Sequence, residues 1–412
     1  MASNNGVEEH KGITSIKSPS KHQPATWLER LPWEIYLDIL SRQPIMSLLD
    51  CKLVSRLWYT SVKHPSLANM HLNHATEDDL YLILFSDWPK STLQLVQVRH
   101  PEGTRTVKTL NTTLDSVFPE FEVVGSCNGL VCLYNYHFDD PLYILNPFAI
   151  EYRELPRFEA SPPSNICRVV FGFGFHPNTK DYKVIKIVYY KQRNNDLFGG
   201  NPEAFVLTLA NVTPAWRNIG KIGYDLIGPT SEALVNGKLH WLTFIRVQEE
   251  VSYREIISFD LETEQFQVVP RPSCGGLNQS NYHLVTLRSC LSAVVTGGGS
   301  NEIWVMKVYN VQTSWSKELV IGNYVPHGMP MAAPPSRRKK NGYQGGAFRV
   351  LCGLKNGEML ILHSKRSIVS YDPNNGEFKE LNFQGLPLEF EATVHMGSLI
   401  SVHTLFSMKI KE

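Results

Sequence analysis

A hairpin signal recurs along this chain and constrains the fold more than any other feature. Three Asn-Gly pairs, at Asn128-Gly129, Asn236-Gly237 and Asn356-Gly357, each stand between two runs of β-forming residues. Asn-Gly favours the type I′ turn, because both central positions of that turn need φ above zero. Each hairpin is followed by a strand that ends in Asn or Asp, a turn and one more short strand. The repeat therefore predicts a series of four-stranded antiparallel units.

Alternation of apolar and polar residues begins near residue 79 and persists through the rest of the chain. A period of two is typical of β-strands. The expected strands are Asp79–Ser86, Leu93–Val98, Val131–Tyr134, Tyr143–Leu145, Lys183–Tyr190, Phe205–Leu209, Ile256–Phe259, Ile303–Val308, Glu358–Leu362 and Ser367–Tyr371. No helical pattern of comparable strength follows residue 70, so we expect one all-β unit.

Two degenerate copies of the repeat lie between the three clear ones. The five copies begin near residues 123, 168, 232, 284 and 347. Their spacing is close to the roughly 50 residues of a kelch unit once loop insertions are allowed for. Spare strands at 79–98 and 392–403 would share a sixth blade and close the ring, which removes open sheet edges. We therefore predict a mainly β chain built on a kelch-like β-propeller, with six blades favoured over seven.

Residues 27–70 have helical rather than β periodicity. Apolar residues between positions 33 and 40 recur at helical spacing, and Pro44 is expected to end this first helix. A second helix is expected to open at Ser47 and to run as far as His64-Pro65. So short a helical segment cannot bury this much apolar surface by itself. A partner is implied.

Charge and cysteine usage exclude several classes of protein. Lys and Arg total 40 against 39 for Asp and Glu, a formal net charge of +1, so the chain lacks the global signature of a nucleic-acid binder. The seven cysteines include no C-x-x-C pair, which argues against zinc or a disulfide framework and for a reducing compartment. Neither a signal peptide nor a membrane helix is indicated. We expect a soluble intracellular protein with a disordered tail at 1–26, a helical domain at 27–70 and a propeller at 71–412.

The helical segment resembles an F-box, and the β region is similar to the plant F-box-associated domain of kelch-like propeller type. The F-box residues are Leu31-Pro32, Ile39-Leu40, Pro44, Leu48-Leu49, Cys51-Lys52, Val54-Ser55-Arg56 and Trp58. The usual Arg-Leu-Pro between the first two helices is Arg42-Gln43-Pro44 here. The propeller motifs are Ser126–Leu133, Leu145-Asn146-Pro147, Phe171–Val184 and Asn236–Trp241.

The resemblance implies a substrate receptor of an SCF-type cullin–RING ubiquitin ligase. Its F-box would bind a Skp-family adaptor, and through it a cullin and a RING subunit, while its propeller would capture a protein for ubiquitylation and proteasomal degradation. The alternative is that the helical residues only form the core of an appendage to the propeller. The residues expected to form the combined core and adaptor interface are Leu31, Pro32, Ile35, Ile39, Leu40, Leu48, Leu49, Val54 and Trp58.

Nothing in the sequence indicates catalysis by this chain. It has no G-x-S-x-G elbow, H-E-x-x-H motif or Walker loop. Phe171-Gly172-Phe173-Gly174 lacks the third glycine of a dinucleotide fingerprint and is interpreted as a closely packed strand, and Cys127 and Cys132 as buried small hydrophobes. The basic run at 337–340 is interpreted as a solvated loop, with nuclear import or an acidic partner as alternatives. We therefore expect no cofactor and no metal, and a location in the cytoplasm, the nucleus or both.

Two other functions stay open at this point. One is an adaptor-bound scaffold that acts outside ubiquitylation. The other is a kelch-like propeller enzyme, such as a copper oxidase, with a helical extension. That enzyme would need Tyr, His and Cys ligands that converge on the propeller axis.

Substrate specificity is expected in the loops that join blade strands, because loops on a rigid scaffold carry recognition. The longest candidates are 159–167, 191–203, 272–282 and 325–346. Aromatic residues and Arg dominate binding hot spots. The candidate substrate anchors are Phe158, Phe198, Tyr282, Tyr324 and Arg337.

Overall fold

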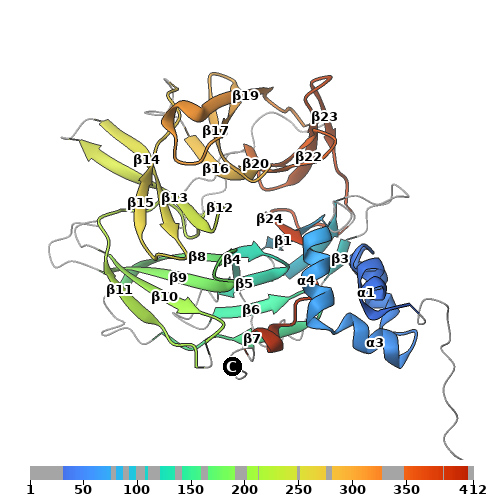
Figure 1. The fold of residues 1–412 in the computed structure, drawn as a ribbon. Helices are drawn as coiled ribbons and strands as arrows, with labels where there is room; N and C mark the ends of the chain where they lie inside the picture. Colours follow the sequence, from blue (N-terminus) through green and yellow to red (C-terminus); the bar gives the residue numbers. More distant parts are fainter. Residues whose placement is uncertain are drawn as a thin grey trace, which may run out of the picture.

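Four short helices are followed by a chain that is almost entirely strand (Figure 1). The computed structural model describes residues 31–75, 80–86, 92–98, 107–109, 121–134, 142–158, 166–190, 202–211, 213–247, 251–274, 281–326, 348–383 and 385–406. The helices are α1 (Trp33–Ser41), α2 (Ile45–Cys51), α3 (Arg56–Val62) and α4 (Pro65–His74), with one further turn, α6 (Val402–Leu405), after the last strand. The tail expected at 1–26 lies outside the described residues.

The described strands form six four-stranded antiparallel sheets, which we number as blades 1 to 6. Blade 1 contains β4 (Glu122–Cys127), β5 (Leu130–Tyr134), β6 (Leu142–Asn146) and β7 (Glu151–Glu154). Blade 2 contains β8 (Ile166–His176), β9 (Asp181–Tyr190), β10 (Glu203–Thr208) and β11 (Arg217–Lys221). Blade 3 contains β12 (Ala233–Val235), β13 (Lys238–Val247), β14 (Val251–Asp260) and β15 (Phe266–Val269).

The remaining three blades follow the same order. Blade 4 contains β16 (Asn281–Leu287), β17 (Cys290–Gly297), β18 (Ser300–Met306) and, after the short 3-10 helix η4 (Gln312–Ser314), β19 (Trp315–Gly322). Blade 5 contains β20 (Phe348–Gly353), β21 (Met359–His363), β22 (Ser367–Asp372) and β23 (Glu377–Glu380). Blade 6 contains β24 (Glu391–Met396), β1 (Leu80–Ser86), β2 (Thr92–Gln97) and β3 (Val107–Thr109).

The ring is closed by the last strand of the chain. β24 pairs antiparallel with β1, the first strand after the helices, with Leu82 opposite Val394 and Phe85 opposite Glu391. The inner strands of blades 4, 5, 6, 1 and 2 contact one another in that order, and blade 3 contacts its neighbours through β12 and β13. The prediction that the two ends of the β region share a sixth blade is confirmed. The strand ends at Met396, however, and the predicted continuation to 403 turns into α6.

Strand direction gives the ring two distinct faces. Because strands alternate in direction within a blade, all inner strands begin at one face, which we call the start face, and finish at the other, the end face. The connections from second to third strand and from one blade to the next lie at the start face. The two remaining turns of each blade lie at the end face. α4 leads into β1, the second strand of blade 6, so the helical module joins the ring at the end face (Figure 1).

The interface between blades 2 and 3 shows how closely the blades pack. Trp241 on β13 is fully buried, and its Nε1 donates a hydrogen bond to the Phe171 carbonyl on β8 at 3.3 Å. A Cβ atom on Gly172 would lie 2.7 Å from Trp241 Cζ2 and 2.9 Å from Ile185 Cγ2. Only glycine fits beneath the indole ring at this position. The interpretation of the Phe171–Gly174 run as a closely packed strand is therefore confirmed.

Two of the three Asn-Gly pairs form the predicted turn. Asn128 and Gly129 have φ of 50° and 79°, and Asn236 and Gly237 have φ of 51° and 70°. The third prediction is wrong, because Gly357 has positive φ (91°) whereas Asn356 does not. Residues 354–358 form a longer connection in which Gly357 N donates to Leu354 O at 2.9 Å. In a longer hairpin loop built on a type I turn, only the residue that follows the turn needs positive φ.

The helices begin and end at residues other than those predicted. Pro44 is the N-cap of α2 rather than only the end of α1, and Ser47 lies inside α2. The single helix predicted from Ser47 to Pro65 is broken after Cys51, because Ser55 caps a new helix by accepting a hydrogen bond from Trp58 N at 3.3 Å. Pro65 opens α4, where its missing N–H is harmless. The boundary expected between residues 70 and 71 falls within α4.

Three histidines connect neighbouring blades as neutral rings, and of these His240 and His395 are buried while His283 is half-buried. His240 Nε2 lies 2.8 Å from Tyr309 Oη across blades 3 and 4, and His283 Nε2 accepts from Val350 N at 3.2 Å across blades 4 and 5. His395 Nδ1 lies 2.9 Å from Ser126 Oγ across blades 6 and 1. Burial lowers the pKa of His240 to about 4 and that of His283 and His395 to about 3.

Replacing Gly172 by alanine is expected to destabilise the propeller by about 1–3 kcal/mol, because the added methyl group must displace the Trp241 ring or a neighbouring aliphatic side chain. Gly322→Ala is the matched control, since Gly322 also lies in a strand and its Cβ would meet nothing within 4 Å. Urea unfolding midpoints of both variants measure the effect. Equal midpoints would show that the interface has room to spare.

Acid is expected to destabilise the ring through the three histidines. Their pKa values are lower in the folded chain than the value of about 6.5 in an unfolded one, so the unfolded state takes up protons first as pH falls below that value. Stability is complete above pH ~6.5, and each histidine removes about 2 kcal/mol by pH 5. Urea titrations at pH 7.5, 6 and 5 measure the slope. His283→Gln, whose amide oxygen can still accept from Val350 N, is expected to reduce that slope, and an unchanged slope would contradict the assignment.

Candidate functional site

The nine helical residues expected to form core and interface separate into three groups. Leu40 and Leu48 are fully buried and belong to the core. Leu31, Ile39, Leu49 and Trp58 are half-buried. Pro32, Ile35 and Val54 are exposed, with 51% of Ile35 and 66% of Val54 accessible to solvent. The structure thus supplies the division that sequence periodicity could not.

The core of the helical module is assembled from one face of each helix. Helix α1 packs against α4, and α2 and α3 pack against each other. The Tyr36 ring, buried on α1, meets the Trp58 ring of α3 edge-on, with their centroids 6.0 Å apart. The buried members of this core are Tyr36, Leu37, Leu40, Ile45, Leu48, Val62, Leu67 and Ala68.

Several large apolar side chains of the same helices point outward. We call them the apolar surface of the helical module: Trp33, Ile35, Leu53, Val54, Leu57 and Tyr59. Leu53 is 87% exposed, because the backbone turns after α2, with Leu53 N bonded to Asp50 O at 2.9 Å. Of these six, only Ile35 and Val54 were predicted as interface residues. The break in the helix between α2 and α3, which local sequence did not reveal, turns Leu53 away from the core.

Positive charges stand beside this apolar surface. Lys52 follows α2, Arg56 opens α3 and Lys63 follows α3, so all three are close to this surface in the chain. Lys63 Nζ lies 4.7 Å from the centroid of the Tyr59 ring, and a hydrogen bond with Tyr59 raises the pKa of Lys63. A partner of this surface would therefore present apolar side chains accompanied by carboxylates.

Three of the five residues proposed as substrate anchors are described by the structure, and they lie in different parts of the ring. Phe158 is half-buried between the rings of Phe205 (4.6 Å) and Trp216 (5.9 Å) and stabilises a buried lysine, with Lys186 Nζ 4.2 Å from its centroid. Tyr324 is also half-buried, and its hydroxyl donates to Glu380 at 3.3 Å. Phe198 and Arg337 lie outside the described residues.

Tyr282 lies inside the molecule rather than on a loop. It is the second residue of β16 and is 2% exposed, in the apolar core between blades 3 and 4. Its hydroxyl donates to Arg254 O at 3.1 Å, and Arg254 Nη1 donates to Tyr282 O at 3.2 Å. Burial raises the pKa of Tyr282 well above its ordinary value. The assignment of Tyr282 to a loop is wrong, because β16 begins at Asn281, and a ring this buried is not available as a surface anchor.

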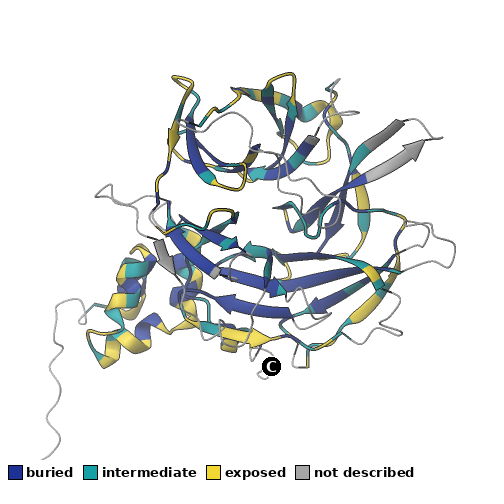
Figure 2. Cartoon of the chain, turned by 180° about the vertical axis from the view of Figure 1, so that it is seen from behind, coloured by how far each residue is buried: buried dark blue, intermediate teal, exposed yellow. Residues whose placement is uncertain are grey.

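Topology nevertheless places the strand ends that flank the four candidate segments on one face. The segments 159–167, 191–203, 272–282 and 325–346 connect β7 to β8, β9 to β10, β15 to β16 and β19 to β20, respectively. Each of these is a connection at the start face. The helical module is attached at the end face, where α4 leads into β1, and it lies to one side of the ring in Figure 2. The two regions suited to binding partners are therefore on opposite sides of the ring.

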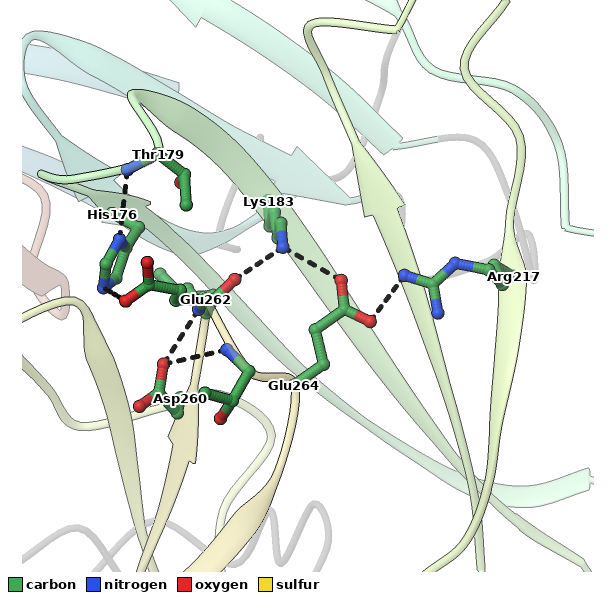
Figure 3. Close-up of polar contacts among 9 residues, drawn as sticks. His176, Thr179, Lys183, Arg217, Asp260, Glu262 and Glu264 are labelled. Atoms are coloured by element: carbon green, nitrogen blue, oxygen red, sulfur yellow. Dashed lines mark hydrogen bonds and ion pairs between the residues drawn. The ribbon is translucent and has the colours of Figure 1, made fainter.

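A charged cluster at the end face joins blades 2 and 3 (Figure 3). Lys183 Nζ donates to Glu264 Oε1 at 2.9 Å, and Arg217 donates to Glu264 Oε2 at 2.5 Å. Burial would raise the pKa of Glu264, but the hydrogen bonds from Arg217 and Lys183 outweigh it and hold that pKa below its usual value. His176 Nε2 lies 3.5 Å from Glu262. The carboxylates of Glu262 and Glu264 on blade 3 therefore have a structural role, because each contacts a basic side chain of blade 2.

Among the described residues, no group of three or more His, Cys, Asp or Glu side chains is arranged to hold a metal ion. Cys127 and Cys132 are buried, as predicted, in the apolar core between blades 1 and 2, and burial raises the pKa of Cys127 to about 12. None of the helices in the described part of the chain is long and apolar enough to cross a membrane.

Comparison with known proteins agrees with this architecture. Residues 28–69 match the F-box domain family, and residues 80–406 match the F-box associated beta propeller domain family. The chain is 42% identical to the Arabidopsis thaliana F-box protein At3g07870, covering 90% of this chain and 92% of that one. It is 23% identical to the F-box/kelch-repeat protein At3g23880 and 24% identical to the F-box protein CPR1 of the same plant. These two alignments cover 91% and 90% of this chain, and 96% and 88% of the relatives.

Solved structures give only a loose likeness. Porphyromonas gingivalis dipeptidyl peptidase 4 superposes with a TM-score of 0.36 at 10% identity, covering 73% of this chain and 44% of that one. A score this low carries no argument about function. The sequence families, the helical module and the closed six-bladed ring agree, and the chain belongs to the family of F-box proteins with an F-box-associated β-propeller domain.

Proposed function

We propose that this protein is the substrate-recognition subunit of an SCF-type cullin–RING ubiquitin ligase. Its F-box docks on a Skp-family adaptor, which links it to the cullin and RING subunits, and its propeller binds the protein to be ubiquitylated. Ubiquitin transfer is then carried out by other subunits, and this chain contributes binding alone. The proposal places the protein in the cytoplasm, the nucleus or both, wherever such a ligase acts.

The observation that carries the proposal is the apolar surface of the helical module. Isolated exposed apolar residues are normal on any protein, but large contiguous apolar patches mark binding sites. Here six large apolar side chains are exposed within residues 33–59, on α1, on α3 and in the connection between α2 and α3. Other side chains of the module already form a buried core, which includes residues of the propeller, so these six residues are surplus to its folding. Helix-in-groove recognition by a partner would cover them.

The opposite placement of the two binding regions supports the second half of the proposal. An adaptor on the helical module would lie at the end face, and the start-face loops would stay open to a substrate. Neither partner would obstruct the other. A bridging receptor needs this separation, because it must hold both partners at once.

Charge on the apolar surface is expected to destroy adaptor binding without unfolding the protein. Leu53→Asp/Val54→Asp places two carboxylates where apolar contact is needed, and we expect the Kd for a Skp-type adaptor to rise about 100-fold or more. Val308→Asp/Val311→Asp is the matched control, since both valines are exposed on blade 4. Isothermal titration on purified proteins, with circular dichroism as the folding check, measures the effect. Equal affinity of both variants would refute adaptor docking at this surface.

Reconstitution separates the ligase receptor from the adaptor-bound scaffold. With adaptor, cullin, RING subunit, ubiquitin and the charging enzymes, a complex that contains the wild-type chain is expected to transfer ubiquitin to a protein that co-purifies with the chain. A mixture that contains the Leu53→Asp/Val54→Asp variant instead is expected to lose this transfer. Immunoblotting for ubiquitin conjugates detects the product. A complex that contains the adaptor but never recruits cullin would favour the scaffold.

A further inference from the structure

The chain continues past its closing strand and crosses the end face of the propeller. We call residues 397–406 the strap. It leaves β24 at Gly397, passes the turn between β6 and β7, and ends in α6 beside those two strands (Figure 1). Gly397, Ser398, Leu399 and Val402 are buried, so the strap is part of the folded interior rather than a loose end.

Two polar side chains of blade 1 hold the strap in place. Asn146 is fully buried, and its Nδ2 donates to Ser398 O at 3.0 Å and to Ile400 O at 2.6 Å. Glu151 Oε2 accepts from Ser401 Oγ at 2.7 Å and from the backbone N–H of the next residue at 2.8 Å. Both groups bind strap backbone, so the path of the strap is determined independently of most of its side chains.

The other side of the strap meets the F-box. A Cβ atom on Gly397 would lie 2.8 Å from Ile45 Cγ2 of α2 and 3.3 Å from Phe148 Cε2 of blade 1. Ile45 is fully buried. Helix, strap and blade pack together at this glycine, and no larger residue fits there without displacing one of them.

Apolar contacts extend this junction on both sides. The buried residues of the F-box belong to the same continuous cluster as those of blades 1 and 6. Propeller members of that cluster include Tyr81, Ile83, Val131, Phe148 and Leu399. Phe148 contacts the Tyr81 ring edge-on at 4.8 Å and stacks on His395 of β24 at 5.8 Å. The F-box therefore shares a core with the ring.

We propose that the strap locks the F-box to the propeller in one fixed orientation, and that the tight Gly397–Ile45 contact is the central contact of this lock. The same peptide closes the ring through β24 and then supports α2, so ring closure and F-box placement are coupled. The lock itself rests on these contacts alone. Its consequence rests on the function proposed above: adaptor and substrate would be held at a constant relative geometry, and the strap residues would act as positioning residues for ubiquitin transfer.

Hydrogen exchange on the full-length chain tests the lock. Gly397→Val must push Ile45 and Phe148 aside, so exchange of the α2 amides and the strap amides is expected to accelerate at least tenfold, with blades 3 and 4 unchanged. Gly322→Val is the matched control, because Gly322 has no atom within 4 Å of its Cβ position. Unchanged α2 exchange in folded Gly397→Val would overturn the proposal.

A milder variant covers the case in which Gly397→Val fails to fold. Glu151→Gln keeps the shape of the side chain but weakens its two hydrogen bonds to the strap. Faster exchange in the strap and α2 with intact blades would support the lock, and faster exchange in the strap alone would overturn it.

Adaptor affinity measured on the same samples separates the two proposals. Variants of the lock are expected to bind a Skp-type adaptor within about threefold of wild type, because the apolar surface of the helical module is untouched, yet to transfer ubiquitin at least fivefold more slowly. If the wild-type chain does not bind adaptor, the proposed function is refuted, but the hydrogen-exchange result still tests the lock. Normal transfer by a variant with a loosened F-box would remove the positioning role.

Discussion

The rest of the structure depends on the pairing of β24 with β1. This contact joins the last strand of the chain to the first strand of the propeller, and without it blade 6 would lack its inner strand. Open sheet edges invite pairing with other chains, so closure protects the ring as well as completing it. The same strand delivers His395 to the interface with blade 1 and delivers the strap to the end face. One long-range pairing therefore determines ring shape, one blade interface and the base on which the F-box rests.

The stability of the interfaces between blades depends on the complementary packing of individual side chains and not only on the apolar area that is buried. At the interface of blades 2 and 3, the indole of Trp241 occupies the space that a side chain at Gly172 would need. At three other interfaces a neutral histidine supplies a hydrogen bond inside an apolar contact. Each device is specific to its own interface, since a misplaced blade would leave a buried ring nitrogen without a partner or a tryptophan without a cavity. The ring is specified interface by interface even though the blades share one architecture.

Sequence reasoning succeeded where a local rule decides the outcome. Alternating residues predict strands, Asn-Gly predicts the hairpins at Gly129 and Gly237, and spare strands at both ends predict closure. It failed where a local cap or turn was misassigned and where distant contacts decide. The break between α2 and α3, which exposes Leu53, is not visible in helical periodicity, and Tyr282 was assigned to a loop because its strand begins without a clear signal. The Gly397–Ile45 contact joins two segments far apart in the chain, and no local pattern reports it.

The exposed apolar surface of the helical module and its rigid junction with the ring are two sides of the same module. Ile45 and Leu48 of α2 are buried in a core shared with the propeller, while Leu53, directly after that helix, is left in water. A freely tethered module would expose both sides and be more flexible, but it would lose conformational entropy each time that it bound a partner in a defined orientation. By burying one side against the ring, the chain presents the other in a single pose. That arrangement suits a protein whose task is to hold two other proteins at a set distance, because the orientation is established once, during folding, rather than at each encounter.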